Sequence, residues 1–307
     1  MRKWRLLATV LGLLALPGGV QAQAETRIEA GTAPCADATA AMPPRAAQAR
    51  GAQAFIAALA KKDDLERDAA ILHELMAGNL PGFLRRAVPA TLRAQRADGR
   101  GVELTLCVLS DYLGLGSEGD FMAVPLSLGS ALAVAAKFGF LLPTPRMVDL
   151  IYSQAGVQLQ PQPLPAGRHM RGTAYLQRHA ALVARQRAAT GAPAAALTAG
   201  HKKDLVLSRR LWLQPGRVAI YGWQRANGAP IQPLSTVHGA AYADYSHGVR
   251  LVSQTMFIDG RPARLLDVLA DAQLGPLLSD EGALPQAADW LAAQRAGSVL
   301  QQRKPRW

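Results

Sequence analysis

Histidines, acids and cations gather in three short stretches of the second half of the sequence, at residues 200–204, 235–239 and 242–250. Half of the six histidines lie in them, namely His201, His238 and His247. Each stretch adjoins an expected strand end, and side chains on loops held by a rigid sheet are typical of functional sites. Because histidine titrates near neutral pH, the stretches indicate general acid–base chemistry.

His247 is the first candidate for a proton-transfer residue. Asp244 lies three residues before it and would orient its ring if the loop curls back, because an extended segment would point the two side chains to opposite faces. His201 and His238 are the supporting candidates. The alternative is that His247 is buried and hydrogen-bonded to a backbone carbonyl.

The same residues form a ligand set that zinc accepts, with water completing a catalytic site: His201, Asp204, His238 and His247. Their spacing contains no H-E-x-x-H pair, and the adjacent Lys202 and Lys203 would repel a cation. The cofactor is therefore left open, with zinc as the less favoured alternative.

A serine nucleophile is a competing mechanism. The available hydroxyls are Ser110, Ser235 and Ser246, with His238 or His247 as the base. No G-x-S-x-G motif is present, because Leu115 stands where the first glycine before Ser117 belongs. The usual α/β-hydrolase site is therefore disfavoured.

Three cations could bind a substrate carboxylate. Lys202 and Lys203 form an adjacent pair, and the Arg250 guanidinium could hold a carboxylate with two hydrogen bonds. Tyr245 and Ser246 complete the expected substrate-binding set. The alternative is a solvated turn with an ordinary surface ion pair.

An acidic, glycine-rich loop follows the first expected strand, at residues 110–120. Its carboxylates would repel a phosphate, and their spacing is not that of a calcium loop. Asp111 and Glu118 could act as paired carboxylates in glycoside cleavage. A tight turn packed against the sheet is the default interpretation.

Several strings make the chain similar to a known family. They are SDYLGLGSEGDF, LPTPRMVDLIY, GHKKD, VAIYGW, PIQPLS and YADYSHGVRLV. They resemble a family of exported bacterial proteins of unassigned function, and the resemblance extends from about Pro81 to Gly282. It implies export and carries no activity.

The secondary-structure elements that must position these residues change from mostly helices to mostly strands along the chain. Helices are predicted at 53–62, 65–77, 127–138, 144–155, 170–190 and 265–271, the fourth beginning with a Thr144-Pro145 cap. Strands are predicted at 102–108, 205–207, 218–223, 231–234 and 249–258, with Asn227-Gly228 as a hairpin turn. The pattern predicts an α+β fold: an N-terminal helical region, then a mostly antiparallel sheet with flanking helices.

The domain organisation follows from the same pattern. A signal peptide is predicted at residues 1–24 and a flexible arm at 25–50, followed by a single α+β domain at 51–292 and a basic tail at 293–307. The domain could divide into a helical subdomain at 51–192 and a sheet-rich subdomain at 193–292.

The composition and charge of the chain limit the classes of partner that are expected. The 307 residues are 50% apolar, which excludes a mostly disordered chain. The net charge of +12 suits an anionic partner, and the alternative is a composition bias of the whole genome toward arginine. Nucleic acid fits poorly, because the arginines are scattered and no basic run alternates with aromatics. No stretch approaches the ~18 apolar residues of a membrane helix, so no transmembrane anchor is expected in the mature chain.

The N-terminus and the cysteines indicate the compartment. Arg2, Lys3 and Arg5 precede a short apolar run and then a small-residue cleavage site, a pattern typical of a secretory leader. An oxidising compartment would permit a disulfide between Cys35 and Cys107, but the sequence leaves their pairing open. The protein is expected in the periplasm or outside the cell.

Two functions are carried forward. The first is an exported hydrolase with a histidine-centred site, acting on a cell-envelope or extracellular polymer such as peptidoglycan peptides. The alternative is a non-catalytic binding protein for an anionic glycan or peptide.

Overall fold

The sequence's helix signals correspond to helices in the computed structural model, which describes residues 34–302. Ser127 and Thr144 cap their helices by accepting hydrogen bonds from Ser130 N and Met147 N, and Asp63 and Glu66 form a capping box. The α-helices are α1 Ala52–Ala58, α2 Asp64–Met76, α3 Leu128–Phe138, α4 Pro145–Gln154, α5 Thr173–Ala189, α6 Arg210–Leu213, α7 Leu265–Ala270, α8 Gly275–Leu278 and α9 Ala287–Gln302. Short 3-10 helices lie at Gly82–Arg85 and Arg168–Arg171.

The strands form two larger sheets and two short pairs. They are β1 Ala87–Gln95, β2 Gly101–Leu109, β3 Gly114–Gly116, β4 Phe121–Ala123, β5 Phe140–Leu141, β6 Val157–Gln158, β7 Thr198–Ala199, β8 Lys203–Leu205, β9 Ile220–Gln224, β10 Pro230–Ser235, β11 His247–Gly248, β12 Val252–Ser253, β13 Thr255–Ile258 and β14 Arg261–Arg264. With helices beside mostly antiparallel sheets, the predicted α+β fold is confirmed.

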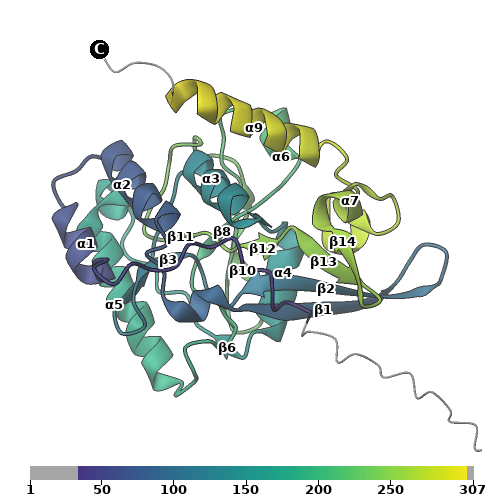
Figure 1. The fold of residues 1–307 in the computed structure, drawn as a ribbon, viewed down its shortest axis with the longest axis horizontal. Helices are drawn as coiled ribbons and strands as arrows, with labels where there is room; N and C mark the ends of the chain where they lie inside the picture. Colours follow the sequence, from purple (N-terminus) through teal and green to yellow (C-terminus); the bar gives the residue numbers. More distant parts are fainter. Residues whose placement is uncertain (1–33, 303–307) are drawn as a thin grey trace, which may run out of the picture. The chain divides into compact units, whose positions relative to one another are not determined.

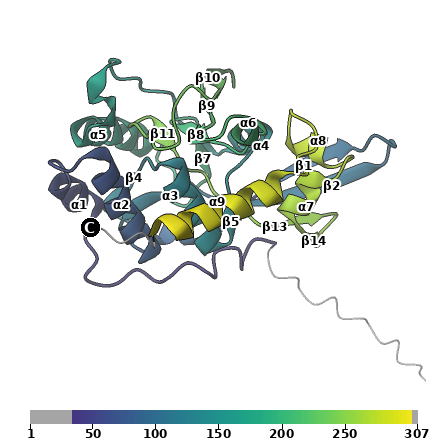
Figure 2. The ribbon, with the colours of Figure 1, turned by 90° about the horizontal axis from the view of Figure 1, so that it is seen from above.

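The central sheet takes strands from both halves of the chain. Its order is β14-β13-β2-β12-β5, with β1 also paired to β2, and every pairing in it is antiparallel. The β1–β2 hairpin extends to the right in Figures 1 and 2. Because β2 bonds to strands beyond residue 250, the sheet crosses the predicted subdomain division at 192/193.

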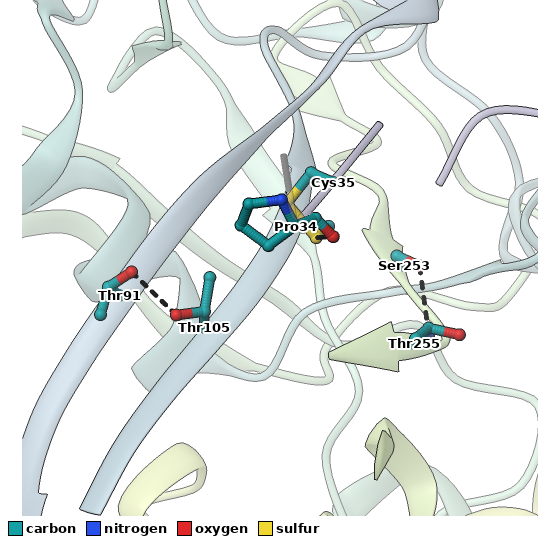
Figure 3. The surroundings of a disulfide bond; sticks show 7 residues. Pro34, Cys35, Thr91, Thr105, Ser253 and Thr255 are labelled. Atoms are coloured by element: carbon teal, nitrogen blue, oxygen red, sulfur yellow. Dashed lines mark hydrogen bonds between the residues drawn. A yellow bond between two sulfur atoms is a disulfide. The ribbon is translucent and has the colours of Figure 1, made fainter. Parts of the chain in front are cut away.

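The strands of this sheet differ from the sequence prediction, which contained no β1, β5 or β14. The long strand predicted at 249–258 is interrupted at Gln254, where Ser253 Oγ accepts a hydrogen bond from Thr255 N at 3.1 Å (Figure 3). The free edge of β1 is covered by the Gln154 side chain, which accepts from Thr91 N at 2.9 Å and donates to Thr91 O at 2.6 Å. The Gln154 amide thus makes the hydrogen bonds that a neighbouring strand would make.

The predicted arm is held against the domain where the structure describes it. Residues 34–50 contain no helix or strand, but a disulfide joins Cys35 to Cys107 of β2 (Figure 3). Thr39 Oγ1 donates to Arg85 O at 2.6 Å, and Arg45 Nε donates to Asn79 Oδ1 at 2.9 Å. These residues are therefore not a loose arm. The predicted signal peptide lies outside the described residues.

The predicted basic tail at 293–307 is helical as far as Gln302, because α9 covers Ala287–Gln302 and packs beside α3 and α7 (Figure 2). A continuous hydrophobic core runs beneath these helices and between the sheets. Buried polar side chains interrupt this core where β8 and β11 meet, and the candidate residues lie there.

Candidate functional site

Two of the polar stretches meet on neighbouring strands. The second sheet has the order β10-β9-β8-β11, in which β11 pairs with β8 in parallel and places His247 opposite Lys203. The Gly248 Cα leaves no room for a side chain, because an added Cβ would lie 2.6 Å from the Tyr112 ring. The glycine therefore lets the two strands and Tyr112 pack closely.

His247 is sealed in the interior, with 0% of its surface exposed. Its Nε2 lies 4.0 Å from Asp244 Oδ2, and neither ring nitrogen has a hydrogen-bond partner among the described residues. Burial lowers the pKa of His247 despite the nearby carboxylate. The loop does curl back toward the ring, yet the imidazole is kept neutral and out of solvent.

Asp244 is the acceptor at the centre of this turn. Its Oδ1 accepts from Ser246 N at 2.8 Å and from Ser246 Oγ at 2.6 Å, while Tyr242 OH donates to Oδ2 at 3.1 Å. Burial acts to raise the pKa of Asp244, but His247 and the Ser246 donors outweigh it and lower the pKa. Because Ser246 Oγ is bonded to the acid, it is not a nucleophile paired to a histidine.

His238 is the one histidine of the three that reaches solvent. It is half-buried and stacks on Tyr242 with ring centroids 4.0 Å apart, and its ring lies 6.1 Å from that of His247. Burial lowers the pKa of His238. The two rings are therefore neighbours.

His201 belongs to a different cluster. Its Nε2 lies 3.5 Å from Asp111 Oδ1, it packs edge-on against Tyr112, and it is 1% exposed. Arg187 pairs with the other oxygen of Asp111. His201 and His238 therefore do not support His247 in one solvent-reachable site as a histidine-centred mechanism requires, because His201 faces this buried ion pair and His247 is sealed.

Asp204 and Arg250 also serve the interior. Tyr112 OH donates to Asp204 Oδ2 at 2.7 Å, and burial raises the pKa of Asp204 to about 7. The Arg250 guanidinium lies 4.3 Å from the Tyr112 ring centre and donates to the backbone oxygens of Leu109 and Thr198. Because both terminal nitrogens of the buried Arg250 already donate to backbone oxygens, Arg250 is not the predicted carboxylate clamp.

Of the remaining predicted substrate-binding residues, Tyr245 and Ser246 are buried in the interior and Lys203 is half-buried. Tyr245 OH is bonded to the backbone of Leu164, and Ser246 is 0% exposed. Both are structural. Lys203 is half-buried with its Nζ 5.2 Å from the Trp223 ring centre.

The described residues form no arrangement that would support the zinc site, the serine nucleophile or the paired carboxylates. Among the described residues, no three His, Cys, Asp or Glu side chains are grouped closely enough to hold a metal ion. Ser110 Oγ donates to Phe83 O at 3.2 Å. Asp111 is bound by Arg187, and Asp120 accepts from Gln53 N at the start of α1, so these acids of the 110–120 loop hold the fold together.

A cavity that the sequence did not predict lies beside the buried cluster. Its volume is about 550 Å³, and one wall is the α5 stripe of Ala180, Val183, Ala184, Arg187 and Ala188, residues spaced to lie on one helix face. The opposite wall includes Phe83, Phe121, Met122 and Glu118. The sequence signal that could have indicated this cavity is the recurrence of small residues three and four positions apart in the predicted helix at 170–190.

His179 and Lys202 close the deep end of the cavity, since they line it and are 0% and 2% exposed. Lys202 Nζ donates to Tyr245 O at 2.6 Å and lies 3.3 Å from His179 Nδ1. Burial, with the charge of Lys202, lowers the pKa of His179 to about 2, so the imidazole is neutral. Burial lowers the pKa of Lys202 to about 8.

Comparisons with family models, with curated proteins and with solved structures find no match to the chain. The resemblance to an exported family stays a prediction. Within residues 34–302, none of the helices has the length and apolar character that crossing a membrane requires. The function must therefore be argued from the cavity and the two clusters.

Proposed function

We propose that this chain is a non-catalytic binding protein whose cavity takes a small ligand with an apolar body and an acidic end, such as the carboxyl terminus of a peptide. The observation that carries the proposal is the position of Lys202 and His179 at the deep end of an otherwise mostly apolar cavity. Apolar walls with a few convergent polar groups are typical of ligand pockets of 300–1,000 Å³.

The apolar body would lie between the two walls. Ala180, Val183 and Ala184 present only small side chains on α5, and Phe83 packs edge-on against Phe121 with ring centres 5.0 Å apart. Apolar surface removed from water contributes roughly 25 cal/mol per Å². These walls therefore supply affinity without fixing the orientation of the ligand.

The acidic end would be fixed by hydrogen-bond donors. A protonated Lys202 uses two of its three hydrogens on Tyr245 O and His179 Nδ1, and the third has no acceptor among the described residues. We assign the ring proton of the neutral His179 to Nε2, because Nδ1 accepts from Lys202. That N–H also has no partner in the described part of the chain. A carboxylate offers acceptors to both donors.

We further propose that the protein works in the periplasm or outside the cell. The leader-like residues 1–24 and the Cys35–Cys107 disulfide support this location, because disulfides persist in oxidising compartments.

Octanoate is a suitable probe, and isothermal titration calorimetry measures its binding. We expect binding to the full mature chain, loss of binding in Ala184→Trp, which fills the cavity, and retention in Ala181→Trp, whose exposed position lies on α5 outside the cavity lining. Affinity should fall as the pH rises above about 8, because Lys202 then loses its charge. Failure of octanoate to bind, or equal binding by Ala184→Trp, would refute the binding of an acidic ligand in this cavity.

Hydrolysis of a cell-envelope polymer remains the second candidate, because one observation favours it: His238 reaches solvent beside Tyr242 and His247. His238 would be the general base, and no described nucleophile is bonded to it. Incubating the protein with peptidoglycan fragments tests this function. Turnover that disappears in His238→Ala and persists in His73→Ala would support hydrolysis over binding alone.

A further inference from the structure

The amine of Lys202 is held by two acceptors, and among the described residues no carboxylate forms an ion pair with it, since Asp244 and Asp111 act on it only from farther away. Tyr245 O accepts at 2.6 Å, and the neutral His179 ring presents Nδ1 at 3.3 Å. A neutral amine has two hydrogens and one lone pair, so it satisfies both acceptors and keeps its lone pair free. When no acidic ligand occupies the cavity, an ammonium would leave its third hydrogen unpaired in a nearly sealed place, which is unfavourable.

We propose that Lys202 is a reactive amine that binds aldehyde or ketone ligands in the cavity as a reversible imine. The proposal rests on the binding cavity argued above and narrows its ligands to those with a carbonyl group at one end. Lysines become nucleophilic in this way when an apolar pocket removes them from water.

The step balances without a further reactant. The lone pair of Lys202 Nζ adds to the carbonyl carbon, and the C=O bond becomes a C–OH group in a carbinolamine. Loss of that oxygen as water, with the two hydrogens of the amine, leaves a C=N bond between ligand and lysine. Water reverses the reaction, so the ligand is held and released without oxidation or reduction.

Lys203 provides an internal comparison on the next residue. It is more exposed than Lys202, and its Nζ lies over the Trp223 ring rather than at the cavity. Burial lowers the pKa of Lys202 to about 8. At pH 7.5 its neutral fraction is therefore roughly 200-fold larger than that of a lysine with the ordinary pKa of about 10.4.

Trapping the imine tests the proposal. The mature protein is incubated with octanal and sodium cyanoborohydride at pH 7.5, which converts an imine into a stable secondary amine, and peptide mass mapping locates the octyl group. We expect Lys202 to be alkylated at least tenfold faster than Lys203. Octanoate should slow the labelling of Lys202, and Ala184→Trp should abolish it while Ala181→Trp does not.

The outcomes separate the two proposals. If octanoate binds in the cavity but Lys202 is labelled no faster than Lys203, the imine proposal is overturned and the binding proposal stands. If octanoate does not bind while Lys202 is labelled selectively, the reactive amine stands and the carboxylate ligand is wrong. Lys202→Arg must lose the label at this position while Lys203→Arg keeps it, and the wild-type labelling ratio decides the question even if a variant misfolds.

Discussion

Replacing the sealed imidazole of His247 should change how stability depends on pH. His247 is 0% exposed, and burial lowers its pKa below the ordinary value near 6.5. As the pH falls below 6.5, the His247 imidazole therefore binds a proton in the unfolded chain but stays neutral in the native state. Native stability is lost with falling pH at about 1.36 kcal/mol per pH unit for this one proton.

The variant His247→Leu removes this proton and nothing that is hydrogen-bonded, because both ring nitrogens lack partners among the described residues. Asp244 keeps both donors from Ser246. Between pH 6.5 and 4.5 the wild type should therefore lose about 2 kcal/mol relative to the variant, because the unfolded imidazole is already half protonated at pH 6.5. A constant offset between the two proteins, from packing of the leucine, does not affect this difference.

Urea unfolding at pH 7.5, 6.5, 5.5 and 4.5 under non-reducing conditions measures both curves. His73→Leu is the matched control, because the His73 side chain is 82% exposed and its replacement leaves the buried turn of Asp244 and His247 unchanged. Parallel curves for His247→Leu, or a wild type that gains on the variant in acid, would mean that Asp244 holds a charged His247. The argument from burial would then be wrong.

Three further perturbations follow from the fold. Replacing Cys35 and Cys107 together by Ala removes a cross-link between residues 72 apart and should lower the free energy of unfolding by about 4 kcal/mol; an unchanged urea midpoint would contradict this. Gln154→Ala uncovers the edge of β1 at Thr91 and should cost about 1–2 kcal/mol, while hydrogen exchange at the Thr91 amide becomes faster. Arg250→Met leaves two buried carbonyls without donors and should lower stability by about 2–5 kcal/mol, whereas retention of full stability would mean that water replaces the guanidinium.

The helices α1 to α5 and α7 could be predicted because their signals are local, whereas α6, α8 and α9 were not predicted. Ser127, the Thr144-Pro145 pair and Asp63 mark helix starts through side chains within one turn. β1 escaped prediction because it contains Pro89 and buries only Ala90 fully, so its pattern resembles a loop. Its pairing with β2 is decided by the partner strand.

The candidate site was only partly visible for the same reason. The sequence indicated that 200–204 and 242–250 lie at strand ends, and β8 and β11 do place His247 beside Lys203. Whether a histidine reaches water depends on residues far along the chain. Asp111 and Tyr112, about 90 residues earlier, enclose His201 and Asp204. Side-chain types alone could not distinguish these buried networks from an open site.

The order in which the chain is synthesised bears on how the central sheet forms. β2 is central to it, yet its neighbours β12 and β13 begin only at Val252 and Thr255. Until those residues are available, a nascent chain carries β2 with one side unpaired, and contacts this distant in sequence form slowly. An unpaired strand edge is prone to pair with other chains. Products truncated before residue 252 should therefore aggregate, and a chaperone that covers β2 during synthesis should raise the yield of native protein.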